Sequence, residues 1–73
     1  MEMNQIGHNI REAREAAGLT QLALAHRIGY KGDDAGAHIC RLEAGDHEPR
    51  VKTLRRLAAA LKTTLPRLLR AEK

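Results

Sequence analysis

The sequence predicts a compact all-α fold of five helices in one domain, residues 1–73, with a core at about 6–69. Apolar residues recur at helical spacing between glycines and prolines, and no segment alternates apolar and polar residues as a strand would. A chain of 73 residues with a single aromatic residue has room for one aliphatic core. Apolar and charged fractions of 42% and 30% favour a folded chain over a disordered one.

Two helices are predicted in the first part of the chain. The inward face of the first has four residues at helical spacing: Ile6, Ile10, Ala13 and Ala17. Asn4 is the expected N-cap of this helix, and Gly18 is expected to end it. Thr20 is expected to cap the second helix, which ends at Gly29. Its inward residues are Leu24, Ala25 and Ile28.

Three further helices are predicted after Gly29. Asp33 or Asp34 is expected to cap the third, which spans about 34–44 and ends at Gly45. Its inward residues are Ala35, Ile39 and Leu42. The inward stripe of the fourth is Val51, Leu54, Leu57, Ala58 and Leu61. The last helix begins at Thr63 or Thr64, with Pro66 in its first turn and three inward leucines, Leu65, Leu68 and Leu69.

Charge is unevenly distributed along the chain. Residues 1–49 contain five Lys or Arg and eight Asp or Glu, a net charge of −3, whereas residues 50–73 contain eight and one, a net charge of +7. A basic segment favours a polyanionic partner such as nucleic acid. The alternative is that these charges form a solvated helix face that binds no partner.

Several other classes of protein are not expected. The single cysteine, Cys40, allows no intramolecular disulfide and suits a reducing compartment, so a cytoplasmic location is predicted. No apolar run approaches the length of a membrane span, and the first residues do not form a signal peptide. His38 and Cys40 point in different directions on a helix, so no metal is expected. No catalytic motif or phosphate loop occurs, which predicts a protein that is neither an enzyme nor cofactor-dependent.

Two short helices joined by a turn describe a helix-turn-helix, with the small Ala25 where the second helix crosses the first. The sequence resembles the helix-turn-helix domains of Cro and the lambdoid phage repressors, the XRE type, over about residues 6–69. The resemblance is carried by Gly18-Leu19-Thr20-Gln21, Leu24-Ala25, Ile28-Gly29, Ile39, Arg41-Leu42-Glu43, Gly45, Pro49 and Thr53-Leu54. The expected fold is therefore lambda-repressor-like.

The sequence departs from this family in the turn before the third helix. Nine residues separate Gly29 from Ile39, more than is usual in the family, and the extra ones fall in residues 30–34. One hypothesis is that Tyr30 folds over the second helix toward Leu22 and fixes the lengthened turn. The alternative is that these two side chains form an exposed patch for a partner or a second subunit.

The resemblance implies that the third helix is a recognition helix in the major groove of DNA. The implied base-facing positions are Gly36, Ala37, Cys40 and Arg41, with His38 at the flank. Arg41 can bond the O6 and N7 atoms of guanine, or alternatively a phosphate, and Ala37 can contact a thymine methyl group.

The resemblance also implies contacts to the phosphate backbone and one structural ion pair. The backbone contacts are expected from Gln21, Lys31, Arg50, Lys52 and the amide of Thr53. The remaining late cations, Arg55, Arg56, Lys62, Arg67 and Arg70, are expected farther from the duplex. Arg14 and Glu43 are expected to pair across the contact between the first and third helices, which assigns both residues to the structure rather than to DNA.

The predicted function is sequence-specific binding of double-stranded DNA by a transcriptional regulator, such as a repressor. A homodimer on a two-fold symmetric site is expected, formed through the loop from Leu61 to Leu65 and the last helix. One alternative is an antitoxin-type adaptor that binds both its operator and an acidic protein partner. The other is a protein-interaction module that does not bind DNA.

Overall fold

The computed structural model of this protein describes residues 3–46 and 48–70. It contains five helices in the order α1 (Met3–Ala16), α2 (Gln21–Arg27), α3 (Gly36–Ala44), α4 (Val51–Ala60) and α5 (Leu65–Leu69). The described residues contain no strand. The predicted all-α fold of five helices is therefore confirmed, although several helix ends differ from the prediction.

For α1, the predicted start is wrong and the predicted end is confirmed. The helix already includes Met3, so Asn4 lies inside it and the predicted N-cap is wrong. Gly18 ends the helix as predicted. It adopts the left-handed conformation, with φ of 73°, and the N–H of Leu19 donates to the Arg14 carbonyl over 3.1 Å. Ala17 lies beyond the last helical residue and is exposed, so its predicted place in the core is wrong.

The start of α2 is as predicted, whereas that of α3 is not. The Thr20 hydroxyl accepts a hydrogen bond from the N–H of Ala23 over 3.0 Å, which caps α2. No carboxylate caps α3, whose N-cap is Ala35. Residues 33–35 form a turn, and the backbone carbonyl of Asp34 accepts from the N–H of Ala37 over 3.1 Å. The predicted side-chain cap is wrong, and the backbone of this turn instead satisfies the amide of Ala37, the second residue of α3.

The last two helices complete the core. Val51 opens α4 with 60% of its surface exposed, so its predicted core position is wrong. Pro66 lies in the first turn of α5, as predicted. All five helices contribute to the core, and its largest fully buried side chains are Ile10, Leu24, Ile39, Leu57 and Leu68.

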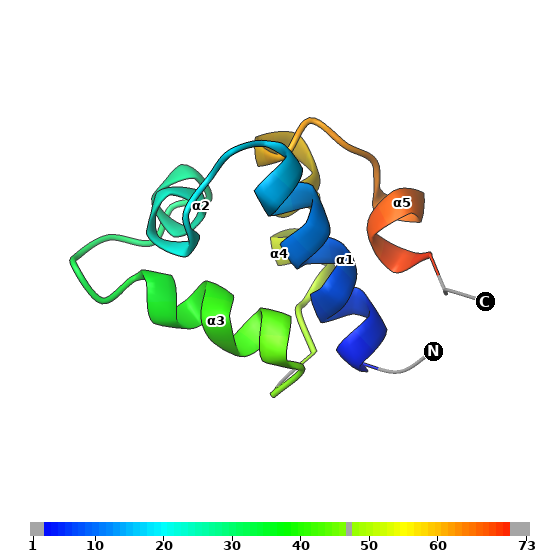
Figure 1. Ribbon diagram of the computed structural model, residues 1–73, viewed down its shortest axis with the longest axis horizontal. Coiled ribbons are helices and arrows are strands. Elements are labelled where there is room, and N and C mark those ends of the chain that lie inside the picture. The colour runs from blue at the N-terminus through cyan, green and yellow to red at the C-terminus, as the bar shows by residue number, and fades with distance from the viewer. Residues whose placement is uncertain (1–2, 47, 71–73) are drawn as a thin grey trace.

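The helices are arranged around α1, which crosses the centre of the view in Figure 1. α3 runs along the lower edge, and α2 lies above its left end. α3 packs against both α1 and α2. α5 lies on the opposite side of α1, at the right. This arrangement leaves the outer side of α3 without a covering helix (Figure 1).

A buried asparagine, which the sequence analysis missed, joins α1 to α5. The Nδ2 group of Asn9 donates hydrogen bonds of 2.8 Å to the carbonyls of both Leu68 and Arg70. Its Oδ1 atom accepts from the amide of Gln5 over 3.1 Å. Asn9 thereby satisfies carbonyls at the end of α5 that have no partner within that short helix.

Candidate nucleic-acid interface

The position of α3 depends on a close approach of its backbone to α1. A Cβ atom on Gly7 would lie 2.5 Å from the carbonyl oxygen of Glu43 and 2.6 Å from that of Leu42. Both distances are shorter than real Cβ contacts, so only glycine fits at this crossing. The sequence analysis did not identify Gly7, because nothing local distinguishes a packing glycine from a tolerated one.

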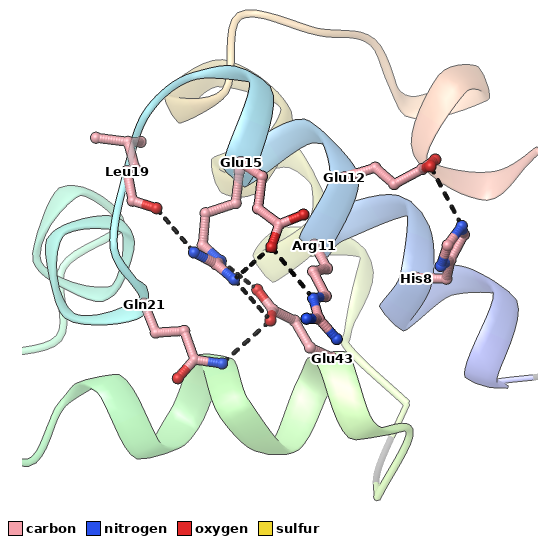
Figure 2. Close-up of polar contacts among 8 residues, drawn as sticks. His8, Arg11, Glu12, Glu15, Leu19, Gln21 and Glu43 are labelled. Atoms are coloured by element: carbon pink, nitrogen blue, oxygen red, sulfur yellow. Dashed lines mark hydrogen bonds and ion pairs between the residues drawn. The ribbon is translucent and has the colours of Figure 1, made fainter.

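An ion pair between Arg14 and Glu43 fixes the same crossing. The Arg14 Nε atom lies 2.6 Å from one Glu43 carboxylate oxygen, and its Nη2 atom lies 3.2 Å from the other. The two side chains are only 12% and 5% exposed. The Nη1 group of Arg14 also donates to the Leu19 carbonyl over 2.8 Å (Figure 2). The pair therefore connects α1, α3 and the link between α1 and α2.

Gln21 adds the first turn of α2 to this network. Its Nε2 group donates to the Glu43 carboxylate over 3.1 Å (Figure 2). The hydrogen bond with Glu43 raises the pKa of Arg14 and outweighs the opposing effect of burial. Among the described residues, no buried side-chain nitrogen or oxygen lacks a hydrogen-bond partner. The orientation of α3 is therefore set by a fully satisfied polar contact.

The outer side of α3 carries most of the residues expected to face DNA. Ala37, His38, Cys40 and Arg41 are all exposed. In the part of the chain that the structure describes, no acidic side chain pairs with Arg41.

Gly36 does not belong to this outer side. It is half-buried, and a Cβ atom there would lie 3.2 Å from the backbone nitrogen of Leu22. The expectation that Gly36 faces outward is therefore wrong, because its α-carbon packs against the first turn of α2.

Two side-chain contacts hold the lengthened turn, residues 30–34. The His26 ring nitrogen Nε2 lies 3.0 Å from the Gly32 carbonyl oxygen, within hydrogen-bond distance. The Tyr30 ring stacks on the ring of His38, with centroids 4.1 Å apart and planes inclined by 10°. Tyr30 thus packs on α3, and the hypothesis that it folds over α2 toward Leu22 is wrong. Leu22 remains 38% exposed, and Lys31 is exposed in the turn.

A shallow hollow of about 270 Å³ connects this turn to the start of α4. Its lining residues include Tyr30 and His38 from the turn and α3, and Glu48, Arg50 and Thr53 from the segment that leads into α4. Arg50 and Lys52 are exposed, whereas Thr53 is half-buried. The structure therefore brings the flank of α3 and the basic N-terminus of α4 to one surface.

Arg56, which the sequence analysis expected farther from the duplex, lies next to this surface. It lines a smaller hollow with Tyr30 and Thr53, and its Nη1 atom lies 3.8 Å from where a Cβ atom on Gly29 would be. The spacing of Thr53 and Arg56, three residues apart on one helix, is the signal that could have placed them together.

Neither a metal site nor a membrane-spanning helix is found in the described part of the chain. No three His, Cys, Asp or Glu side chains within residues 3–46 and 48–70 gather into a group that could hold a metal ion. No helix among those residues is long and apolar enough to cross a membrane.

α2 and α3 are two short helices joined by a turn, and no other helix covers the outer side of α3. This arrangement defines the helix-turn-helix class. A protein-family model described as a helix-turn-helix domain matches residues 5–72, and the chain belongs to this family. This class suggests a DNA-binding regulator and is typically not enzymatic. No curated protein and no solved structure gives a significant match to the chain.

Proposed function

We propose that this protein binds specific sequences of double-stranded DNA as a transcriptional regulator, with α3 in the major groove. The observation that carries the proposal is the outer side of α3, which no other helix covers while Arg14 and Glu43 anchor its inner side. An α-helix fits the major groove of B-form DNA, where each base pair presents a distinct pattern. Membership of the helix-turn-helix family and the resemblance to XRE-type repressors support this docking.

Base recognition is assigned to the exposed residues of α3. Arg41 is unpaired within the described chain and can donate two hydrogen bonds to the O6 and N7 atoms of a guanine. Ala37 is small enough to approach a thymine methyl group. Cys40 lies beside them, and His38 is held at the flank by the Tyr30 ring.

Phosphate contacts are assigned to residues on either side of α3. Gln21 donates one N–H to Glu43, and its amide has a second N–H for a phosphate oxygen. Arg50, Lys52 and the amide of Thr53 supply positive charge and a donor at the start of α4. Lys31 extends the basic surface into the lengthened turn, and Arg56 extends it along α4.

A symmetric dimer is part of the proposal. Helix-turn-helix dimers bind two half-sites about one helical turn of DNA apart, 34–36 Å. The link from Leu61 to Leu65 and α5 lie away from α3 and are the proposed dimer surface (Figure 1). Sedimentation of the protein with and without a palindromic duplex measures the expected stoichiometry of two chains per site.

Selection of bound duplexes from a random pool tests the proposal. We expect a defined sequence, and affinity for it should fall as salt rises, with a slope of about −0.9 per neutralised phosphate. Arg41→Ala should relax the preference at one base pair, while Arg50→Ala should weaken all sites alike. Enrichment of no sequence together with salt-independent affinity would contradict the proposal.

One observation favours a second candidate, a protein-interaction module that does not bind DNA. Exposed acids flank α3 at both ends: Asp33 and Asp34 before it, Asp46 and Glu48 after it. These carboxylates repel a phosphate backbone and lower its affinity for this surface. If the module is correct, even Asp33→Asn with Asp34→Asn will bind no duplex at low salt. Under the DNA-binding proposal, the same double variant binds its site more tightly than the unchanged chain.

A further inference from the structure

We infer that a basic groove on the side of the molecule away from α3 binds an acidic peptide segment of a partner protein. The groove has a volume of about 540 Å³. It is lined by the C-terminal ends of α1 and α4, which lie at the top of the view in Figure 1, together with Arg27 of α2 and Arg67 of α5. None of its lining residues belongs to α3 or to the proposed DNA interface, so this inference does not depend on DNA binding. Four of them, Leu61, Lys62, Thr63 and Arg67, belong to the proposed dimer surface, so a bound peptide and a second copy of the chain compete for this side of the molecule.

The lining of the groove is partly apolar and partly cationic. The apolar part, here called the floor, comprises Ala13, Ala16 and Ala17 at the end of α1 and Ala60 and Leu61 at the end of α4. Methyl groups permit close approach of a peptide backbone and bury an apolar side chain that lies on them. The floor therefore suits a peptide with at least one apolar residue, which a free phosphate or a small inorganic anion would not use.

The cationic part, here called the rim, comprises the exposed Arg27, Lys62 and Arg67, and no acidic side chain among residues 3–46 and 48–70 lines the groove. Within the described chain, none of the three has an acidic partner. Like charges around one groove repel each other, and an anionic occupant relieves that repulsion. The occupant is therefore expected to carry carboxylates on both sides of its apolar residue.

The backbone at Lys62 supports the same assignment. Lys62 follows α4 in the left-handed conformation, with φ of 54°, and is the one described non-glycine residue with positive φ. The corresponding positions after α1, α2 and α3 are glycines: Gly18, Gly29 and Gly45. Left-handed backbone is unfavourable for a residue with a Cβ atom, so a lysine here places its charge on the rim at a conformational cost.

A synthetic peptide with a pair of leucines flanked by glutamates on both sides tests the inference by nuclear magnetic resonance. We expect its addition to shift the amide signals of residues 13–17 and 60–63 and to leave those of α3 unchanged. Arg67→Glu should weaken binding several-fold, and Arg27→Glu with Arg67→Glu should weaken it about tenfold. Arg55→Glu is the matched control. It makes the same change of charge on an exposed arginine that does not line the groove, and should have little effect.

Three results would overturn the inference: no binding of the peptide, binding that shifts α3 instead, or equal losses in Arg67→Glu and Arg55→Glu. A duplex oligonucleotide that shifts residues 60–63 more strongly than the peptide would also overturn it, since the groove would then be a second nucleic-acid contact. Thermal melting of each variant verifies that the fold is retained. If no duplex binds at α3 while the peptide binds at the groove, the proposed DNA function is wrong and the inference of a peptide-binding groove is supported.

Discussion

The α1–α3 crossing and the lengthened turn both position α3, but by different means. At the crossing, the nearly buried pair of Arg14 and Glu43 is bonded to two further groups, and the backbones touch at Gly7. In the turn, residues 31–34 are exposed, and the side-chain contacts of the turn are one hydrogen bond from His26 and one stacked ring pair. The fold is thus tightly constrained where helices cross and lightly constrained beside the proposed DNA surface, where local opening costs least.

This contrast separates two consequences of mutation. Changes at the crossing should lower the stability of the whole molecule, because they leave buried groups unpaired or force backbones apart. Changes in the turn should alter its mobility and any DNA affinity while most of the stability remains. The four predictions below run from the largest expected effect to the smallest.

Glu43→Ala should be the most damaging change at the crossing. It leaves the Arg14 guanidinium mostly buried with only the Leu19 carbonyl as a close partner, and we expect a loss of about 3 kcal/mol in the free energy of unfolding. Urea unfolding followed by circular dichroism measures this loss. Because the pKa of Arg14 is raised, the stability linked to its protonation is fully present at neutral pH and is lost as the pH rises through that raised value.

Glu15→Ala is the matched control for this prediction. Glu15 is also an acid beside Arg14, but it is 56% exposed and the two groups lie 4.0 Å apart, so its removal should cost less than about 1 kcal/mol. Replacing both members of the buried pair, as Arg14→Met with Glu43→Leu, should recover part of the loss. Equal effects of Glu43→Ala and Glu15→Ala would show that the pair has no special importance.

Gly7→Ala should lower the free energy of unfolding by about 1–3 kcal/mol, because the new methyl group meets backbone carbonyls that cannot move without shifting α3. Helix propensity alone predicts a gain of about 1 kcal/mol from the same substitution, so the two effects have opposite signs. Thermal melting decides between them. A more stable Gly7→Ala variant would mean that the crossing is looser than the structure indicates.

Tyr30→Ala should cost about 1 kcal/mol, the contribution typical of a stacked ring pair. The expected result is faster amide hydrogen exchange in residues 31–36, with the exchange of α1 almost unchanged. Tyr30→Phe keeps the ring and serves as the control, and it should behave like the unchanged chain. Slower exchange, or no change at all in the turn, would show that stacking on His38 does not hold it.

His26→Ala should have the smallest effect, about 0.5 kcal/mol, because its hydrogen bond to the Gly32 carbonyl is exposed to water. Faster amide exchange at residues 32–35 is the expected observation. His26→Gln retains a donor and should restore part of the protection. If His26→Ala destabilises the chain as much as Glu43→Ala, the contrast between the crossing and the turn is wrong.

The helices were predictable because their signals are local. Apolar spacing identified the buried side chains of α2 and α3, and Gly18 and Thr20 marked helix ends through their own backbone or hydroxyl chemistry. The predicted cap at Asp33 or Asp34 was wrong because it, too, rested on a local signal alone. An acid before a helix is a good cap, but the sequence does not show that the turn uses the Asp34 carbonyl instead.

The parts that escaped prediction depend on contacts between distant segments. Gly7 and Asn9 look like ordinary helix residues until α3 and α5 pack against them. Tyr30 was expected over α2, but its stacking on His38 depends on how the lengthened turn returns the chain. Within the candidate interface, sequence reasoning identified exposed residues such as Arg41 and left out Arg56, which only the packing of α4 beside Gly29 brings close.

The two hydrogen bonds from Asn9 have a consequence for the order in which the molecule can assemble. They connect the first helix to carbonyls 59 and 61 residues later. During synthesis, α1 emerges well before Leu68 and Arg70. The side of α1 that faces α5 therefore stays open to solvent after α1 and α3 can already pack together, and closing so long a loop precedes the gain from these contacts. Docking of α5 on α1 is thus expected as a late, non-local step in the assembly of the core.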